Sequence, residues 1–296
     1  MSENEEKTNE QGFGTTGHSW DGIEEWNNPL PRWWLWTFYV TILWGVIYTI
    51  AYPAWPLVNK ATEGVLGFST RANVAEDIAA VETANASIME ALANVELASL
   101  PGNTDLHGFA VNAGAAIFRA NCSQCHGAGA AGVQASGYPN LLDDAWLWGG
   151  TIDEIAYTVA HGIRNEQSPD ARWSEMPAFG EILSDEEIAQ VVAYVRSISG
   201  QEHDAGLASA GETLFADNCT SCHGDDGAGM RDLGAPNLTD AIWLYGGSEA
   251  TLTETVTYSR FGVMPAWSEE YRPGSGLSQA EVNAVAAYVH QLGGGE

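Results

Sequence analysis

The chain has 296 residues, which is room for about two domains, and 45% of its residues are hydrophobic, so it is too apolar to be disordered throughout. Its 39 acidic and 11 basic residues give a formal net charge of −28. This charge argues against a nucleic-acid partner, because nucleic-acid-binding proteins cluster Lys and Arg, and it favours basic protein partners.

An uncharged apolar segment near the N-terminus predicts a transmembrane helix. Residues 33–52 contain no charged side chain, and 20 residues are enough to span a hydrocarbon core of ~30 Å. Aromatic side chains gather at both membrane interfaces. Here they are Trp33, Trp34 and Trp36 at one end, and Tyr48, Tyr52 and Trp55 at the other. A buried core helix and a cleaved signal peptide are the alternatives, but a signal peptide would begin with basic residues, and this N-terminus is long and acidic. We therefore expect an N-terminal segment at 1–32 and an uncleaved membrane helix at 33–55.

The next segment, 56–105, is expected to be a linker that contains one amphipathic helix. Apolar residues recur at helical spacing and so share one face. They are Val74, Ile78, Val81, Ile88, Leu92 and Val95. We expect this face to pack on the protein itself or on a partner membrane subunit, and we assign no chemistry to it.

Residues 106–296 contain an internal duplication. The segment GAAIFRANCSQCHG (114–127) matches GETLFADNCTSCHG (211–224), and Cys122 and Cys219 are 97 residues apart. The two later Met-Pro-Ala segments, at Met176 and Met264, are only 88 residues apart, so the second copy lacks nine residues before its methionine. We expect two domains, a first repeat at 106–200 and a second repeat at 201–296.

The four cysteines form two copies of the pattern C-x-x-C-H, which is the attachment signature of a c-type haem. The copies are Cys122, Cys125 and His126, and Cys219, Cys222 and His223. Two thiols at this spacing can reach the two vinyl groups of one porphyrin, and the histidine can supply an imidazole nitrogen to the iron. Disulfides and a zinc site are the alternatives, but paired zinc motifs are usually only about 15–20 residues apart. The sequence therefore predicts two covalently bound haem c groups.

Each repeat is expected to place its haem between two crossing helices. The helix before each motif carries a glycine and a phenylalanine on one face, four residues apart, and a bare glycine lets another helix approach closely. Each repeat closes with a capping box and an apolar helix, starting at Ser184 with Glu187 and at Ser278 with Glu281. These elements predict an all-α fold in which the opening and closing helices of each repeat cross.

Two of the five methionines are candidates for the sixth iron ligand. Met1 is the initiator, Met89 lies in the linker and Met230 is only seven residues after His223, which leaves Met176 and Met264. A proline follows each of these two, which bends the chain so that the sulfur can point at the iron. Ordinary core packing is the alternative, and ligation of one haem by two histidines also stays open. The sequence does not fix which methionine serves which haem, and we assume that each repeat uses its own.

Other side chains near the motifs are candidates for the walls of the haem pockets. Arg164, Arg172 and Arg260 lie in the loops before the methionines, where they would pair with haem propionates or remain exposed. The tryptophans expected to line the pockets are Trp146, Trp148, Trp173, Trp243 and Trp267.

Taken together, these segments resemble one family, the dihaem subunit III (CcoP or FixP type) of cbb3-type cytochrome c oxidases. The general c-type motifs are joined by MPAFG (176–180), GVMPAW (262–267) and, more specifically, by NNPLPRWW (27–34) and AYPAWPL (51–57) around the membrane segment. The likeness covers nearly the whole chain from about His18.

The resemblance implies a transmembrane helix followed by two tandem class I c-type cytochrome domains in the bacterial inner membrane. The N-terminus would be cytoplasmic and the cytochrome domains periplasmic. Electrons would come from a soluble or membrane-bound basic cytochrome c, or from the cytochrome bc complex. They would pass to the monohaem cytochrome c subunit and on to the catalytic haem–copper subunit, so this chain would hold no catalytic residue. A haem-based sensor and a dihaem cytochrome for another reductase are the rival functions.

Overall fold

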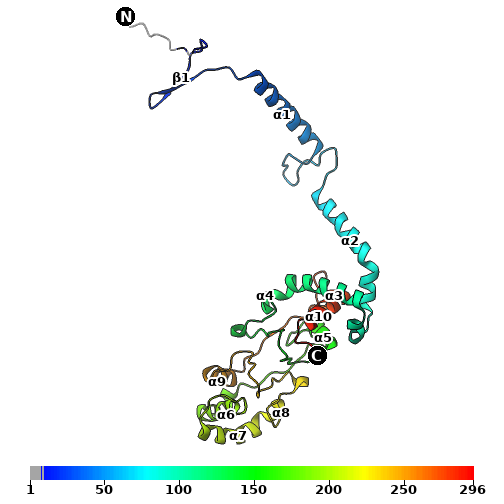
Figure 1. The fold of residues 1–296 in the computed structure, drawn as a ribbon, viewed down its shortest axis with the longest axis vertical. Helices are drawn as coiled ribbons and strands as arrows, with labels where there is room; N and C mark the ends of the chain where they lie inside the picture. The colour runs from blue at the N-terminus through cyan, green and yellow to red at the C-terminus, as the bar shows by residue number, and fades with distance from the viewer. Residues whose placement is uncertain (1–7, 9) are drawn as a thin grey trace. The chain divides into compact units, whose positions relative to one another are not determined.

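The computed structural model describes residue 8 and residues 10–296 (Figure 1). The chain divides into two compact units, Met1–Thr83 and Ala84–Glu296, and each is described by itself. The second unit contains both C-x-x-C-H motifs.

The first unit contains a small hairpin that the all-α expectation did not include. Strand β1 (Thr15–Trp20) pairs antiparallel with β2 (Ile23–Trp26). The two turn residues, Asp21 and Gly22, have φ values of 52° and 82°. Positive φ at both positions is the geometry of a tight two-residue hairpin turn, for which Asp-Gly is a strong sequence signal.

Helix α1 (Arg32–Ala51) is long and apolar enough to cross a membrane, and none of its residues is buried in the protein. It ends four residues before the expected limit at 55. Pro53 explains this difference, because the residue before a proline is pushed out of the helical region.

Helix α2 (Thr70–Ala93) runs across the boundary between the two units. The apolar face expected along it is divided in two. Val74, Ile78 and Val81 are exposed, whereas Leu92 is fully buried in the second unit. There the carbonyl of Leu92 accepts a hydrogen bond from the buried Asn283 amide, at 2.8 Å.

The second unit consists of helices and loops. Its α-helices are α3 (Thr104–Ile117), α4 (Ser123–His126), α5 (Ile152–His161), α6 (Asp185–Ile198), α7 (Ala205–Asn218), α8 (Thr220–His223), α9 (Glu249–Tyr258) and α10 (Gln279–His290). Short 3₁₀ turns lie at Leu97–Gly102, Gln134–Ser136, Phe179–Glu181 and Arg231–Leu233, and a π-helical turn at Phe118–Cys122. The expected capping boxes at Ser184 and Ser278 are present, and Thr151 forms a third with Glu154.

The helix pairing contradicts the expectation that each repeat folds on itself. Opening helix α3 of the first repeat packs on α10, which closes the second repeat, and opening helix α7 of the second packs on α6, which closes the first. Figure 1 shows α3 beside α10, and α6 beside α7. At the crossings Gly114 faces the backbone of Ala284, and Gly211 faces that of Gln190.

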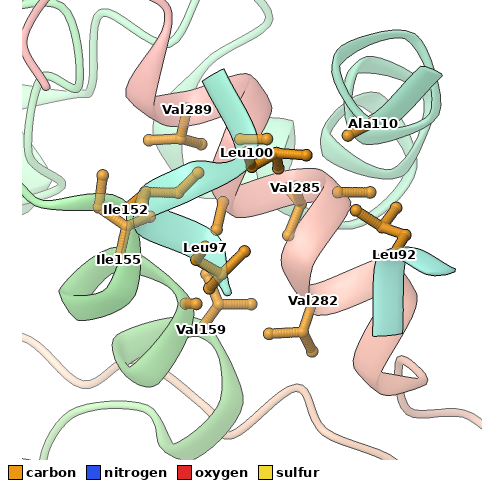
Figure 2. Packing of buried hydrophobic residues seen from close by; sticks show 14 of the residues in the cluster. Leu92, Leu97, Leu100, Ala110, Ile152, Ile155, Val159, Val282, Val285 and Val289 are labelled. Atoms are coloured by element: carbon orange, nitrogen blue, oxygen red, sulfur yellow. The ribbon is translucent and has the colours of Figure 1, made fainter. Parts of the chain in front are cut away.

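This pairing produces two lobes, each with its own apolar core. The first lobe contains α3, α4, α5 and α10, and the end of α2 packs into its core (Figure 2). The second lobe contains α6, α7, α8 and α9, around Val191, Val192 and Phe215. The second lobe is one continuous segment, and the first lobe is built from the chain on both sides of it.

We predict that Gly114→Ala destabilises the haem-loaded protein by about 1–3 kcal/mol, the usual range for overpacking a tight contact. A Cβ at this position would lie 2.1 Å from the Ala284 carbonyl oxygen, so one helix would have to move. Denaturant unfolding followed by circular dichroism measures the change.

Gly108→Ala in the same helix is the matched control, because a Cβ there meets no atom within 4 Å. Alanine has the higher helix propensity, so this variant should be unchanged or slightly more stable. Equal unfolding midpoints for the two variants would contradict the tight crossing.

Candidate haem sites

The two C-x-x-C-H motifs begin where the opening helices end. Cys122 is the last residue of the π-helical turn after α3, and the short helix α4 carries Cys125 and His126. In the second lobe Cys219 follows α7, and α8 carries the remaining residues of the motif. Each motif is thus held by a helix that a bare-glycine crossing fixes against its neighbour.

The two motif histidines are oriented by matching hydrogen bonds. Nδ1 of His126 donates to the carbonyl of Pro139 at 3.3 Å, and Nδ1 of His223 donates to the carbonyl of Pro236 at 3.1 Å. This bond fixes the tautomer that leaves the Nε2 lone pair free for a metal. Burial lowers the pKa of both imidazoles, and the hydrogen bond to the proline carbonyl partly offsets this effect. The neutral ring is the form that binds iron.

The four cysteines of the two motifs are present as free thiols, so no disulfide joins them. Burial raises the pKa of Cys122 and Cys219 to about 11, with a smaller contribution from the second thiol of each motif. Among the described residues, no group of three or more His, Cys, Asp or Glu side chains could hold a metal ion such as zinc.

The two candidate methionines lie in the lobes opposite to those we assumed. Met176 of the first repeat lines a cavity of about 360 Å³ together with Cys219, Cys222 and His223 of the second. Met264 of the second repeat packs on the first-lobe core, as does Cys122. This placement differs from the assumption that each repeat keeps its own methionine. The reason is that each methionine precedes a closing helix and follows that helix into the other lobe.

The lobes meet through a reciprocal pair of contacts. Gly137 lies against the ring of Tyr245, and Gly234 lies against the ring of Trp148. Trp148 and Tyr245 are 97 residues apart, as are the two glycines, so the contact follows the sequence duplication. Both glycines have positive φ, and a side chain at either position would collide with the ring. These contacts hold the two lobes together in one unit.

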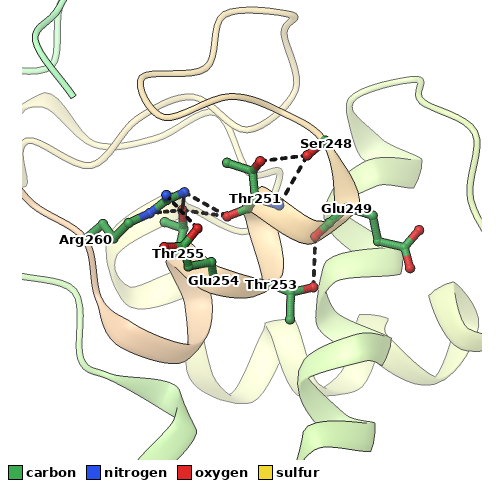
Figure 3. A network of polar contacts seen from close by, with 7 residues as sticks. All are labelled: Ser248, Glu249, Thr251, Thr253, Glu254, Thr255 and Arg260. Atoms are coloured by element: carbon green, nitrogen blue, oxygen red, sulfur yellow. Dashed lines mark hydrogen bonds and ion pairs between the residues drawn. The ribbon is translucent and has the colours of Figure 1, made fainter. Parts of the chain in front are cut away.

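The arginines expected near the propionates are held by neighbouring groups. Arg164 donates to the carbonyls of Gly262 and Ser174, and it lines the second-lobe cavity. Arg260 also lines this cavity, and it is held by Thr251, Thr255 and Glu254 (Figure 3). Arg172 differs, because it stacks over Trp148 at 5.5 Å and donates to Thr158.

The tryptophans are distributed less evenly than expected. Trp243 lines the second-lobe cavity, and Trp146 and Trp267 pack on the first-lobe core. Trp148 is buried between the lobes. Trp173 is 57% exposed, so the expectation of a pocket wall fails at this position.

The residues present fit a haem in each lobe. The second lobe offers a cavity with two thiols and a buried imidazole on its wall and a thioether from Met176. In the first lobe, Cys122 and Met264 pack on the same apolar core, and the carbonyl of Pro139 orients the imidazole of His126.

Sequence reasoning missed several contributors to these sites. The carbonyls of Pro139 and Pro236 orient the histidines, and the duplicated Pro-Asn-Leu triplets were the available signal. The amide of Asn165 reaches the backbone of Met264 at 3.1 Å. No sequence pattern indicated this contact, because it joins residues of different repeats.

Three family models match successive segments of the chain. The model for the N-terminal domain of cytochrome oxidase-cbb3, FixP, matches residues 12–59. The model for cytochrome c oxidase, cbb3-type, subunit III matches residues 109–195, and the cytochrome c model matches residues 208–293.

Several curated proteins are similar over almost their whole length. The cbb3-type cytochrome c oxidase subunit CcoP of Cereibacter sphaeroides is 61% identical over 284 residues, which are 95% of each chain. The subunit CcoP of Rhodobacter capsulatus is 54% identical, over 95% of this chain and 96% of its own. The subunit FixP of Sinorhizobium medicae is 49% identical over 96% of each chain.

The fold and the paired motifs define a c-type cytochrome with two covalently bound haem c groups. The family models match the chain from residue 12 onwards, and its relatives are similar over almost the whole length. The chain therefore belongs to the CcoP/FixP family of cbb3-type cytochrome c oxidase subunits. Its function is electron transfer within that oxidase. Helix α1 and the membership of a membrane-bound oxidase assign it to the inner membrane.

Proposed function

We propose that each haem is held by the histidine of one repeat and the methionine of the other. His126 and Met264 would hold the first haem, attached at Cys122 and Cys125. His223 and Met176 would hold the second, attached at Cys219 and Cys222. The observation that carries this proposal is the cavity that joins Met176 to the second motif.

The haem irons supply a reversible one-electron change between Fe(III) and Fe(II). A histidine and a methionine as ligands would raise the reduction potential of the bound iron. The proline carbonyls orient the imidazoles, and Cys122 and Cys219 pack on the apolar cores of their lobes. The direct contact of the lobes through Trp148 and Tyr245 supports transfer between the two haems.

We further infer that α1 spans the membrane once, with the N-terminus cytoplasmic and the lobes periplasmic. Covalent haem attachment takes place outside the bacterial cytoplasm, which supports this orientation. The partners would be the catalytic haem–copper subunit and the monohaem cytochrome c subunit. The electron donors would be a basic cytochrome c or the cytochrome bc complex.

The limits 106–200 and 201–296 describe the two sequence repeats. We propose them as the limits of the repeats and not of the two lobes.

The exchange of methionines is tested in variants that keep one haem. With Cys219→Ser and Cys222→Ser only the first haem is attached, and Met264→Ala should then abolish the charge-transfer band between thioether and ferric iron. Met176→Ala in the same background should leave the band in place. Visible and near-infrared absorption measures it.

The converse background, Cys122→Ser with Cys125→Ser, should show the opposite dependence on the two methionines. Loss of the band on replacing the methionine of the same repeat would overturn the exchange. The ligand methyl resonances of the protein with both haems provide a second measurement, since each Met→Ala variant should remove one of them.

The role in the oxidase is tested by purification of the full chain from membranes in mild detergent. We expect the haem–copper subunit and the monohaem subunit to elute with it, and we expect the complex to oxidise a reduced cytochrome c. Elution with subunits of another reductase, and without those two, would contradict the proposed function.

The formal charge of −28 predicts strongly salt-dependent electron entry from a basic cytochrome c. Attraction between opposite charges raises association rates by about 10–1,000-fold. Raising the ionic strength from about 0.01 to about 0.15 M shortens the Debye length from about 30 to about 8 Å. Stopped-flow reduction should slow by at least about tenfold over this range. A salt-independent rate would show that the acidic surface serves another purpose.

A further inference from the structure

The backbone of Met264 is tied to the first repeat by a short bridge. Its N–H donates to the carbonyl of Ile163 at 3.0 Å, and its own carbonyl accepts from the N–H of Ile163 at 2.9 Å. This bridge lies just after α5, so the methionine of one repeat is held by the chain of the other.

A buried amide adds a second tie to the same carbonyl. Asn165 is 8% exposed, and its Nδ2 donates to the carbonyl of Met264 at 3.1 Å and to that of His161 at 2.9 Å. Its Oδ1 accepts from the N–H groups of Gln167 and Ser168, at 3.1 and 3.3 Å. All four hydrogen-bonding positions of the amide are used, which fixes its rotamer.

The loop that carries Asn165 is itself held in place. Ser168 is 4% exposed, and its hydroxyl lies 3.2 Å from Nδ1 of His161 and accepts from the N–H of Asp170 at 3.2 Å. This loop falls in the stretch where the second repeat is nine residues shorter, so the second repeat has no counterpart of it.

Met176 is held differently. In the part of the chain that the structure describes, its backbone has one hydrogen bond, from the hydroxyl of Ser259 to its carbonyl.

The contact between Asn165 and Met264 is also tightly packed. A Cβ at Gly162 would lie 2.3 Å from the Met264 carbonyl oxygen and 2.4 Å from Nδ2 of Asn165.

We propose that Asn165 is a positioning residue for Met264, which it holds in place as the iron ligand of the first haem. The proposal rests on the proposed ligation of that haem by Met264. The amide acts through the peptide carbonyl and leaves the sulfur free to bind. Because no such amide binds the carbonyl of Met176, the thioether of the second site is held less firmly. The difference between the two sites originates in the loop that carries Asn165, which the second repeat lacks.

The test is competition between the thioether and added imidazole for ferric iron in the full chain with both haems. Asn165→Ala and Asn165→Asp should each raise the affinity of the first site for imidazole about tenfold, the equivalent of one net buried hydrogen bond. Affinity at the second site should not change. Asn165→Asp keeps the acceptor for Gln167 and Ser168, so the loop retains its turn if the alanine variant does not fold.

Ser259→Ala is the matched control, because it removes the hydrogen bond from the Ser259 hydroxyl to the carbonyl of Met176. This variant should raise the affinity for imidazole at the second site and leave that at the first site unchanged. Met264→Ala and Met176→Ala assign the two titrations to their sites. If Met264→Ala left the first haem unchanged, the proposed ligation would be wrong, whatever Asn165 does.

Two results would overturn the role of Asn165 itself. One is an unchanged imidazole affinity at the first site in both folded variants. The other is an equal rise at both sites, which would indicate general loosening of the unit. Failure of both variants to fold with the first haem attached would also contradict a role confined to positioning.

Discussion

The arrangement of both haem sites depends on two helix crossings at which a glycine lies directly on a neighbouring backbone. At Gly114 an added Cβ would lie 2.1 Å from the Ala284 carbonyl oxygen, and at Gly211 it would lie 2.0 Å from that of Gln190. Aromatic pairs flank the two crossings, Phe118 with Tyr288 and Phe215 with Tyr194. These contacts hold the closing helix of each repeat against the opening helix of the other. Each haem motif is thereby covered by a helix from the other repeat.

Much of each site could be predicted from local sequence, because its chemistry is local. The C-x-x-C-H patterns, the uncharged segment at 33–52 and both predicted capping boxes depend on residues a few positions apart. The hairpin at 15–26 was equally local, and its Asp-Gly turn was overlooked inside a polar segment. The family comparison then agreed with the function that these local patterns indicated.

Helix pairing could not be read in the same way, because the duplication makes it ambiguous. The two closing helices present the same kind of surface, with Tyr194 and Tyr288 each four residues after the contact point. Either opening helix could therefore dock on either closing helix. The connections at 162–175 and 259–264 resolve the choice, since they carry the chain from one lobe to the other and bridge each other at Ile163 and Met264. The helix pairing therefore depends on the path of the whole chain, and no short sequence pattern predicts it.

One consequence of the continuous second lobe concerns biosynthesis. A chain emerges from its N-terminus, so residues 176–258 are all available before Met264 and α10 have been made. The lobe whose cysteines are synthesised first is therefore the last to acquire all its helices. Until α10 arrives, the faces of α3 and α5 that pack on it are uncovered. Cys122 and Cys125 are therefore synthesised well before the closing helix of their lobe. Cys219 and Cys222 are synthesised after theirs, α6.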